Sequence, residues 1–165
     1  MALIIENGSR VANATSYVTL AEARAYASAR GVTLSAVDAE VESKCILAMD
    51  FIEALRDRYQ GLKVAYDQAL QFPRYPLTID SFTIPSTSIP LALKQAQCQL
   101  VIELNNGIDL TPTGDGKFLV REKIDVIENE WAPGSGSSSP VLTKFDSLIS
   151  PLFKTPNGGL VSSRA

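Results

Sequence analysis

The sequence predicts a mainly α-helical fold, with a three-helix core around a long central helix, a β-hairpin or extended ribbon, and a C-terminal helix with a tail arm. Three observations predict this fold. Apolar residues recur at helical spacing in three segments upstream of Gly107. β-Branched and aromatic residues alternate with charged ones over residues 118–131, which is typical of strands. A Pro-Gly-Ser run then separates this ribbon from a last apolar segment.

We expect a helical core domain over residues 1–116, the ribbon over 117–133, a flexible linker over 134–139, and a C-terminal helix with an extended tail over 140–165. A chain of 165 residues, 45% of them apolar, can bury a core without disulfide or metal staples. No apolar run approaches the about 18 residues of a membrane span, and we expect no signal peptide.

The first helix is predicted from about Leu20 to Arg30. Thr19 and Glu22 form a capping box, in which the threonine hydroxyl accepts a free backbone N–H and the glutamate reaches back. Gly31 then supplies the left-handed residue that commonly ends a helix.

The second helix follows a cap at residues 35–38 and is predicted to end near Tyr59. Its apolar face is wide, which indicates contacts on more than one side, so we expect it to be the central helix. The apolar positions are Val37, Val41, Cys45, Ala48, Met49, Ile52, Leu55 and Tyr59.

Residues 62–89 are expected to be irregular, because proline removes a backbone donor and restricts the residue before it. These prolines are Pro73, Pro76 and Pro85, and the side chains expected to pack the segment onto the core are Ile79, Phe82 and Ile84. Pro90 suits the first turn of a third helix, which is predicted to end before Gly107. Its apolar face comprises Leu93, Ala96, Leu100, Val101 and Leu104.

The ribbon that ends at Trp131 has no cleanly apolar face. Because an isolated two-stranded hairpin is marginally stable in water, we expect support from the core or from another chain. Trp131 is accordingly interpreted as an anchor, either in the core or in a contact between subunits. Downstream, Pro140 opens a short helix, and the weakly cationic tail after it has little to fold around.

The residues offer no candidate for catalysis, for a cofactor or for a metal. The chain has no histidine, which removes the usual general base and the usual zinc ligand. No phosphate-binding glycine loop or paired-carboxylate motif is found. Cys45 and Cys98 lie within helical segments and are interpreted as buried thiols. We expect the protein not to be an enzyme.

The formal net charge of −3 and the scattered basic residues count against tight DNA binding. Single-stranded DNA would need cations and exposed aromatic rings in a groove. The candidates cluster around the end of the second helix: Arg56, Arg58, Tyr59, Lys63, Tyr66, Arg74 and Tyr75. Side chains that anchor loops are the preferred interpretation of this set.

Several motifs together resemble a family of tailed-phage head–tail connectors, the adaptor or head-completion proteins. The motifs are MALIIENG at residues 1–8, ATSYVTLAE at 14–22, QALQFPR at 68–74, IP at 89–90 and EWAP at 130–133. Such sequences are often labelled DnaT-like single-stranded-DNA-binding proteins.

The resemblance implies a structural virion protein, made in the host cytoplasm, that forms a ring of about twelve copies in the phage neck. Its partners would be the portal protein and a downstream neck or tail-completion protein, with no membrane, and genomic DNA would pass through the ring without specific binding. The alternative is a single-stranded-DNA-binding protein of phage replication. Candidate portal or subunit contacts are Trp131, Val141, Leu142, Phe145, Leu148, Ile149, Leu152, Phe153, Leu160 and Arg164.

Overall fold

The computed structural model describes residues 2–111, 117–121, 130–133 and 140–154. The helical elements are α1 (Leu20–Ser28), α2 (Asp38–Ala54), η1 (Arg56–Arg58), α3 (Leu91–Asn105), α4 (Thr143–Ile149) and η2 (Ser150–Leu152). The strands are β1 (Leu62–Lys63), β2 (Arg74–Tyr75), β3 (Thr78–Ile79), β4 (Phe82–Thr83), β5 (Lys117–Arg121) and β6 (Glu130–Pro133). Four α-helices and three small antiparallel strand pairs in these ranges make the fold mixed α/β, so the expectation of a mainly α fold is only partly confirmed.

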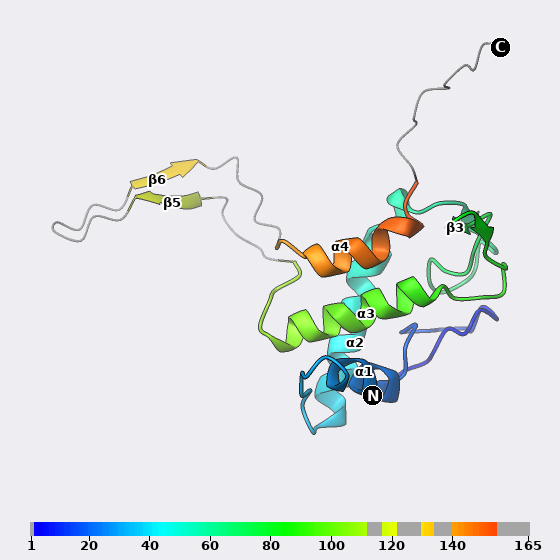
Figure 1. Cartoon of the computed structure of the whole chain (residues 1–165), viewed down its shortest axis with the longest axis horizontal. Helices are drawn as coiled ribbons and strands as arrows, with labels where there is room; N and C mark the ends of the chain where they lie inside the picture. Colours follow the sequence, from blue (N-terminus) through cyan, green and yellow to red (C-terminus); the bar gives the residue numbers. More distant parts are fainter. Residues whose placement is uncertain (1, 112–116, 122–129, 134–139, 155–165) are drawn as a thin grey trace, which may run out of the picture.

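The helix at the centre of the core is α3, which packs against α1, α2 and α4 (Figure 1). The prediction that the second helix is central is therefore wrong, although α2 is the longest helix described. α2 also ends at Ala54, earlier than predicted, and η1 follows it. No helix in the described part of the chain is long and apolar enough to cross a membrane.

A buried glutamine explains why α3 can be central despite its polar residues. The side chain of Gln97 accepts a hydrogen bond from the backbone N–H of Tyr17 at 3.0 Å. Its amide nitrogen donates to the hydroxyl of Ser16 at 2.8 Å and to the carbonyl of Cys45 at 2.9 Å. A buried amide is tolerated when its donors and acceptor are paired. Gln97 thereby joins α3 to α2 and to the segment before α1.

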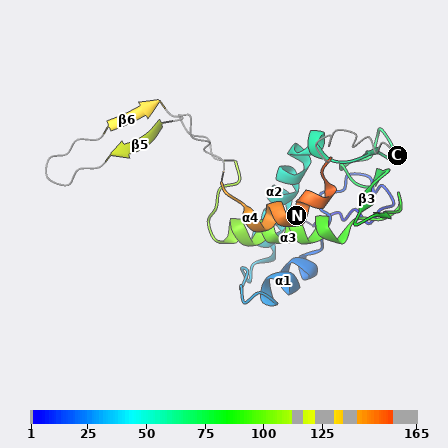
Figure 2. The same cartoon turned by 45° about the horizontal axis from the view of Figure 1, so that its top comes forward.

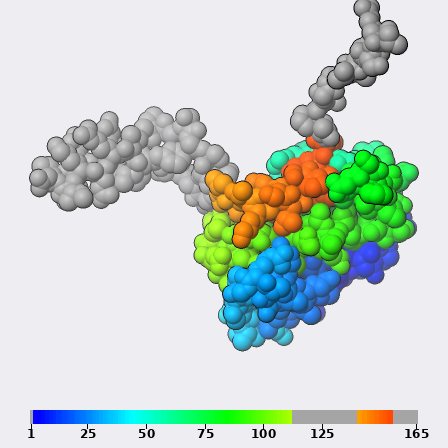
Figure 3. Space-filling model, viewed as in Figure 1, coloured from blue at the N-terminus to red at the C-terminus, as the bar shows by residue number. Residues whose placement is uncertain are grey.

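The predicted C-terminal arm is part of the core as far as η2. α4 lies along α3 on the surface of the helical body, as Figure 3 shows. Phe145 is buried and meets Phe51 of α2 edge to face, with ring centroids 5.5 Å apart. Leu142, Ile149 and Leu152 are buried in the same cluster. The predicted linker at 134–139 and the tail from residue 155 lie outside the described residues.

The hairpin predicted near residues 117–131 is present as the antiparallel pair β5–β6, with Phe118 opposite Ala132 and Leu119 opposite Trp131. A second pair, β3–β4, is closed by Asp80 and Ser81, whose φ angles are +50° and +69°. Two consecutive left-handed residues make the kind of tight turn that matches the twist of a hairpin.

Cys45 and Cys98 are buried and unpaired, as predicted. Burial raises the pKa of the Cys45 thiol to about 11 and that of the Cys98 thiol to about 12. Both thiols therefore stay protonated at neutral pH and behave as small apolar groups.

Candidate functional site

Segments far apart in the sequence meet at one end of the molecule, which we call the loop-rich end: residues 56–84 together with residues 150–154. Tyr59 and Phe153 form an antiparallel bridge. On either side of it, the N–H of Gln60 donates to the carbonyl of Leu152 at 2.9 Å, and the N–H of Lys154 donates to the carbonyl of Arg58 at 2.8 Å. Figure 2 shows β3 in this region, beside the N-terminal end of α3.

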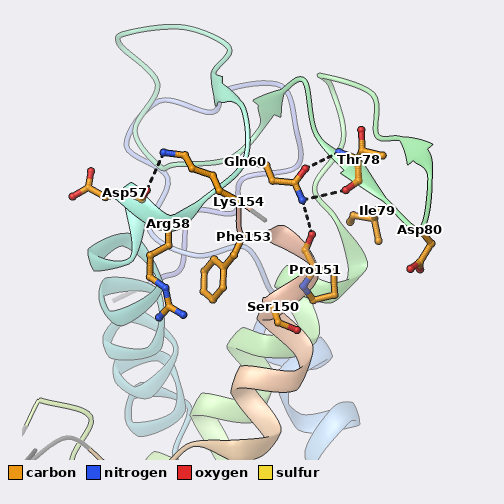
Figure 4. Close-up of a pocket in the computed structure, with 10 residues that line it drawn as sticks. All are labelled: Asp57, Arg58, Gln60, Thr78, Ile79, Asp80, Ser150, Pro151, Phe153 and Lys154. Carbon is orange, nitrogen blue, oxygen red and sulfur yellow. Dashed lines mark hydrogen bonds between the residues drawn. The ribbon is translucent and has the colours of Figure 1, made fainter. Parts of the chain in front are cut away.

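This bridge forms one wall of an open cleft of about 720 Å³, shown in Figure 4. The side chain of Gln60 ties two walls together, because it bonds to the backbone N–H and carbonyl of Thr78 and to the carbonyl of Pro151. The lining residues are Asp57, Arg58, Gln60, Thr78, Ile79, Asp80, Ser150, Pro151, Phe153 and Lys154.

Two cations of the cleft are held in defined places. The guanidinium carbon of Arg58 lies 4.0 Å from the centroid of the Phe153 ring, a cation–π arrangement visible in Figure 4. The Nζ of Lys154 donates to the carbonyl of Asp57 at 3.0 Å. Both side chains are otherwise exposed. Their charges are partly balanced, since the carboxylates of Asp57 and Asp80 line the same cleft.

The sequence-predicted DNA contacts fall into two groups. Arg56 and Arg58 are exposed, and the rings of Tyr66 and Tyr75 are 97% and 54% exposed. By contrast, Tyr59 is fully buried, and its hydroxyl donates to the carbonyl of Ile52 at 2.9 Å.

Arg74 and Lys63 belong with the buried or anchored group. Arg74 is only 7% exposed, and burial lowers the pKa of its guanidinium. Half-buried Lys63 donates from Nζ to the carbonyl of Gln68 at 2.9 Å. Tyr59, Lys63 and Arg74 therefore anchor loops, which is the interpretation preferred for this set. A DNA contact by Tyr59 or Arg74 stays a prediction, and it would require a side chain that is buried here to become exposed.

A second anchor fixes the same loops to α2. Both carboxylate oxygens of Glu53 accept from the N–H of Gln71, at 3.0 and 2.9 Å. The buried hydroxyl of Tyr17 also donates to Glu53 and accepts from the N–H of Phe72. Burial is the main cause that raises the pKa of the Glu53 carboxyl above its ordinary value. This cluster holds the segment that leads into β2.

Sequence reasoning missed three features of the loop-rich end. Lys154 belongs by sequence to the cationic tail, and nothing in the sequence indicates that its backbone N–H bonds to the carbonyl of Arg58. The role of Gln60 in joining two walls has no sequence signal either. Phe82, expected to pack onto the core, is instead 74% exposed next to the strained turn. The left-handed turn that follows Ile79 orients it outward.

Four of the predicted portal and subunit contacts are buried in the chain's own core: Leu142, Phe145, Ile149 and Leu152. Another molecule could contact them only if α4 left this position. Val141 is 89% exposed, and Leu148 and Phe153 are half-buried. Three further predicted contacts are not part of the described structure: the side chain of Trp131, and Leu160 and Arg164.

No curated protein and no solved structure matches this chain. One family model does match it, over residues 1–165, and its description is "Putative DnaT-like ssDNA binding protein". The match agrees with the DnaT-like label of the resemblance and with the DNA-binding alternative; it gives no support to a role in a phage neck. Since the model spans the whole chain, the protein belongs to this DnaT-like family.

Proposed function

We propose that the protein binds single-stranded DNA at the loop-rich end. The observation that carries the proposal is the arrangement of Arg58, whose guanidinium lies over the Phe153 ring at an open cleft that Lys154 also lines. A guanidinium held against a ring by one face keeps its other face and its N–H groups for a base or a phosphate. The family match supports the same activity.

Exposed aromatic rings elsewhere on the loop-rich end support the proposal further. Tyr66, Tyr75 and Phe82 are mostly exposed on its loops and strands. Bases of any sequence stack on such rings, while cations neutralise the phosphates, which is the usual pattern of binding without sequence preference. Because Arg58 is already ordered by Phe153, less conformational entropy is lost when it contacts a ligand.

Acidic residues limit the affinity for DNA that we expect. Asp57 and Asp80 line the cleft, and the whole chain carries a formal charge of −3. We therefore expect dissociation constants in the micromolar range and a strong dependence on salt. Each phosphate contact contributes about −0.7 to the slope of log K against log salt for single strands.

Fluorescence anisotropy with a labelled oligothymidylate, titrated at several salt concentrations, tests the proposal. R58Q is expected to weaken binding about tenfold, since it removes one stacking or phosphate contact. R30Q is the matched control, because the guanidinium carbon of Arg30 also lies over a ring, 3.3 Å from the centroid of Tyr26, but at the C-terminal end of α1. Absence of binding at low salt, or equal effects of R58Q and R30Q, would overturn the proposal.

A second candidate is the adaptor ring of a phage neck, a non-enzymatic role with portal and downstream neck or tail-completion proteins as partners. The motif resemblance favours it, and Val141, one of the predicted portal or subunit contacts, is 89% exposed in the segment before α4. Mass photometry tests it: a closed ring of about twelve copies is expected, alone or with portal protein. A monomer under both conditions, absent from purified particles, would exclude this role.

A further inference from the structure

We propose that Arg74 is a positioning residue of the DNA-binding site, in that it fixes the segment that bears Arg58 relative to the strand that bears Tyr75. The inference rests on the proposed function and concerns the same site. It assigns Arg74 a structural role in place of the direct DNA contact that the sequence suggested.

The guanidinium of Arg74 uses three nitrogens for bonds within the protein. Nε donates to the carbonyl of Gln60 at 2.7 Å, and Nη2 donates to the carbonyl of Gly61 at 2.7 Å. Nη1 donates to the side-chain oxygen of Gln71 at 2.9 Å. At 7% exposure, this side chain has its charged end directed at the protein backbone, so a phosphate cannot reach it without breaking these bonds.

The segment that Arg74 holds approaches the next one very closely. Gly61 has a φ of +60°, and a Cβ atom at this position would lie 2.3 Å from the carbonyl oxygen of Pro76. Only glycine fits there without displacing backbone. Gly61 allows the turn to pack against the end of β2, and Arg74 bonds that turn in place.

The proposed phosphate contact, Arg58, and the proposed stacking ring, Tyr75, lie on the two segments that Arg74 joins. Residues 58–61 run from Arg58 through Gln60 to the two carbonyls that Arg74 bonds, and residues 152–154 pair with them on the opposite side. Tyr75 directly follows Arg74 in β2 and lies opposite Leu62. The distance between a base stacked on Tyr75 and a phosphate at Arg58 therefore depends on the Arg74 bonds.

Lysine cannot replace arginine in this role. The carbonyls of Gln60 and Gly61 and the amide of Gln71 are bonded by three separate nitrogens of one planar group. Lysine has the same charge but only one nitrogen, on a flexible chain. R74K thus removes the geometry and keeps the charge, which separates positioning from electrostatic attraction.

The experiment is an anisotropy titration with oligothymidylate over a salt series, for the wild type, R74K, R74Q and R58Q. R74K is expected to bind about tenfold more weakly with an unchanged salt slope, because no phosphate contact is lost. R58Q should make the slope shallower by about 0.7. In an R58Q background, R74K should weaken DNA binding by a smaller factor than it does alone, since a positioning residue acts through the residue it positions.

Circular dichroism at the assay temperature shows whether R74K is folded. A folded variant that binds DNA more weakly has lost the geometry of the site, whereas an unfolded variant says nothing about positioning. If R74K is unfolded there, Q71M, which removes one of the three bonds, is used for the same test. About threefold weaker binding at an unchanged slope would support the inference.

Three outcomes overturn a proposal. Wild-type affinity in folded R74K, or in Q71M where that variant is used, would overturn this inference alone. A slope for R74Q as shallow as that of R58Q would mean that Arg74 contacts a phosphate, and would overturn it too. No binding by the wild type would overturn the proposed function itself.

Discussion

In the helical core, elements meet mainly through apolar side chains, whereas at the loop-rich end polar side chains also bond to the backbone of segments distant in sequence. Leu93, Leu100 and Ile149 are fully buried between helices. The loop-rich end buries Tyr59, Phe72 and Leu77 as well, but its segments are further joined by Gln60 and Arg74, which bond to carbonyls of other segments.

The difference explains where free side chains are found. A helix pair needs its apolar faces for stability, so those faces are unavailable to a ligand. A loop held by a few side-chain-to-backbone bonds can leave its other side chains exposed, as Arg58, Tyr66 and Phe82 are. The loop-rich end is therefore the part of the described structure best suited to contact another molecule, and the following changes test that contrast.

The largest loss of stability is expected for F145A, which removes a buried ring from the contact between α4 and α2. Truncating a buried phenylalanine costs about 3–5 kcal/mol of unfolding free energy. Urea denaturation measures this loss. V141A is the control, because Val141 is 89% exposed in the segment before α4 and should change stability by less than about 0.5 kcal/mol. A small loss for F145A would mean that α4 is not part of the core.

A smaller loss of unfolding free energy is expected for Q97L, which nearly keeps the volume of the side chain at position 97 but removes its hydrogen bonds. The N–H of Tyr17, the carbonyl of Cys45 and the hydroxyl of Ser16 would each lose a buried partner. We expect a cost of about 2–3 kcal/mol in urea denaturation, because unpaired buried polar groups are destabilising. An unchanged or higher stability would show that the core does not depend on this polar link.

The anchor of the loop-rich end should depend on pH. Burial raises the pKa of Glu53 in the folded protein above its ordinary value of 4.5, so the folded state binds this proton more tightly than the unfolded chain. The resulting stabilisation is complete below the unfolded-state pKa and is lost as the pH rises through the folded-state pKa.

E53Q removes this titration. The stability of the wild type relative to E53Q should therefore fall as the pH rises above about 4, as measured by urea denaturation over a pH series. A difference that rises with pH would contradict the assignment.

The smallest expected effect is a gain in stability, for the substitution S81G. Ser81 has a φ of +69° in the turn between β3 and β4, a conformation that glycine adopts without strain. S81G should stabilise the protein by up to about 1 kcal/mol in thermal denaturation. S43G, in the middle of α2, should instead destabilise it by about the same amount. A loss of stability in S81G would mean that the serine side chain has a structural role.

The sequence predicts the regular parts of this molecule well, because their signals are local. The capping box of Thr19 and Glu22 is present, and α3 begins directly after Pro90. The position of α3 in the core could not be read in this way. Gln97 looks like a surface residue until its partners, which lie in other segments, are known.

The loop-rich end was the least predictable region, since its geometry depends on pairs distant in sequence. Tyr59 is buried, in agreement with its place among the predicted apolar positions, but only its bridge to Phe153 brings Arg58 to residues 152–154. The same limit applies to α4. Its apolar face is evident in the sequence, but the sequence does not state whether α3 or another molecule covers it.

Amide chemical-shift mapping with unlabelled oligothymidylate tests the central claim most directly. A DNA site at the loop-rich end predicts salt-sensitive shifts concentrated in residues 56–63, 74–82 and 150–154, with α1 and the C-terminal half of α3 nearly unchanged. Shifts spread over α1 and α3 instead, or a spectrum that DNA leaves unchanged at low salt, would contradict it.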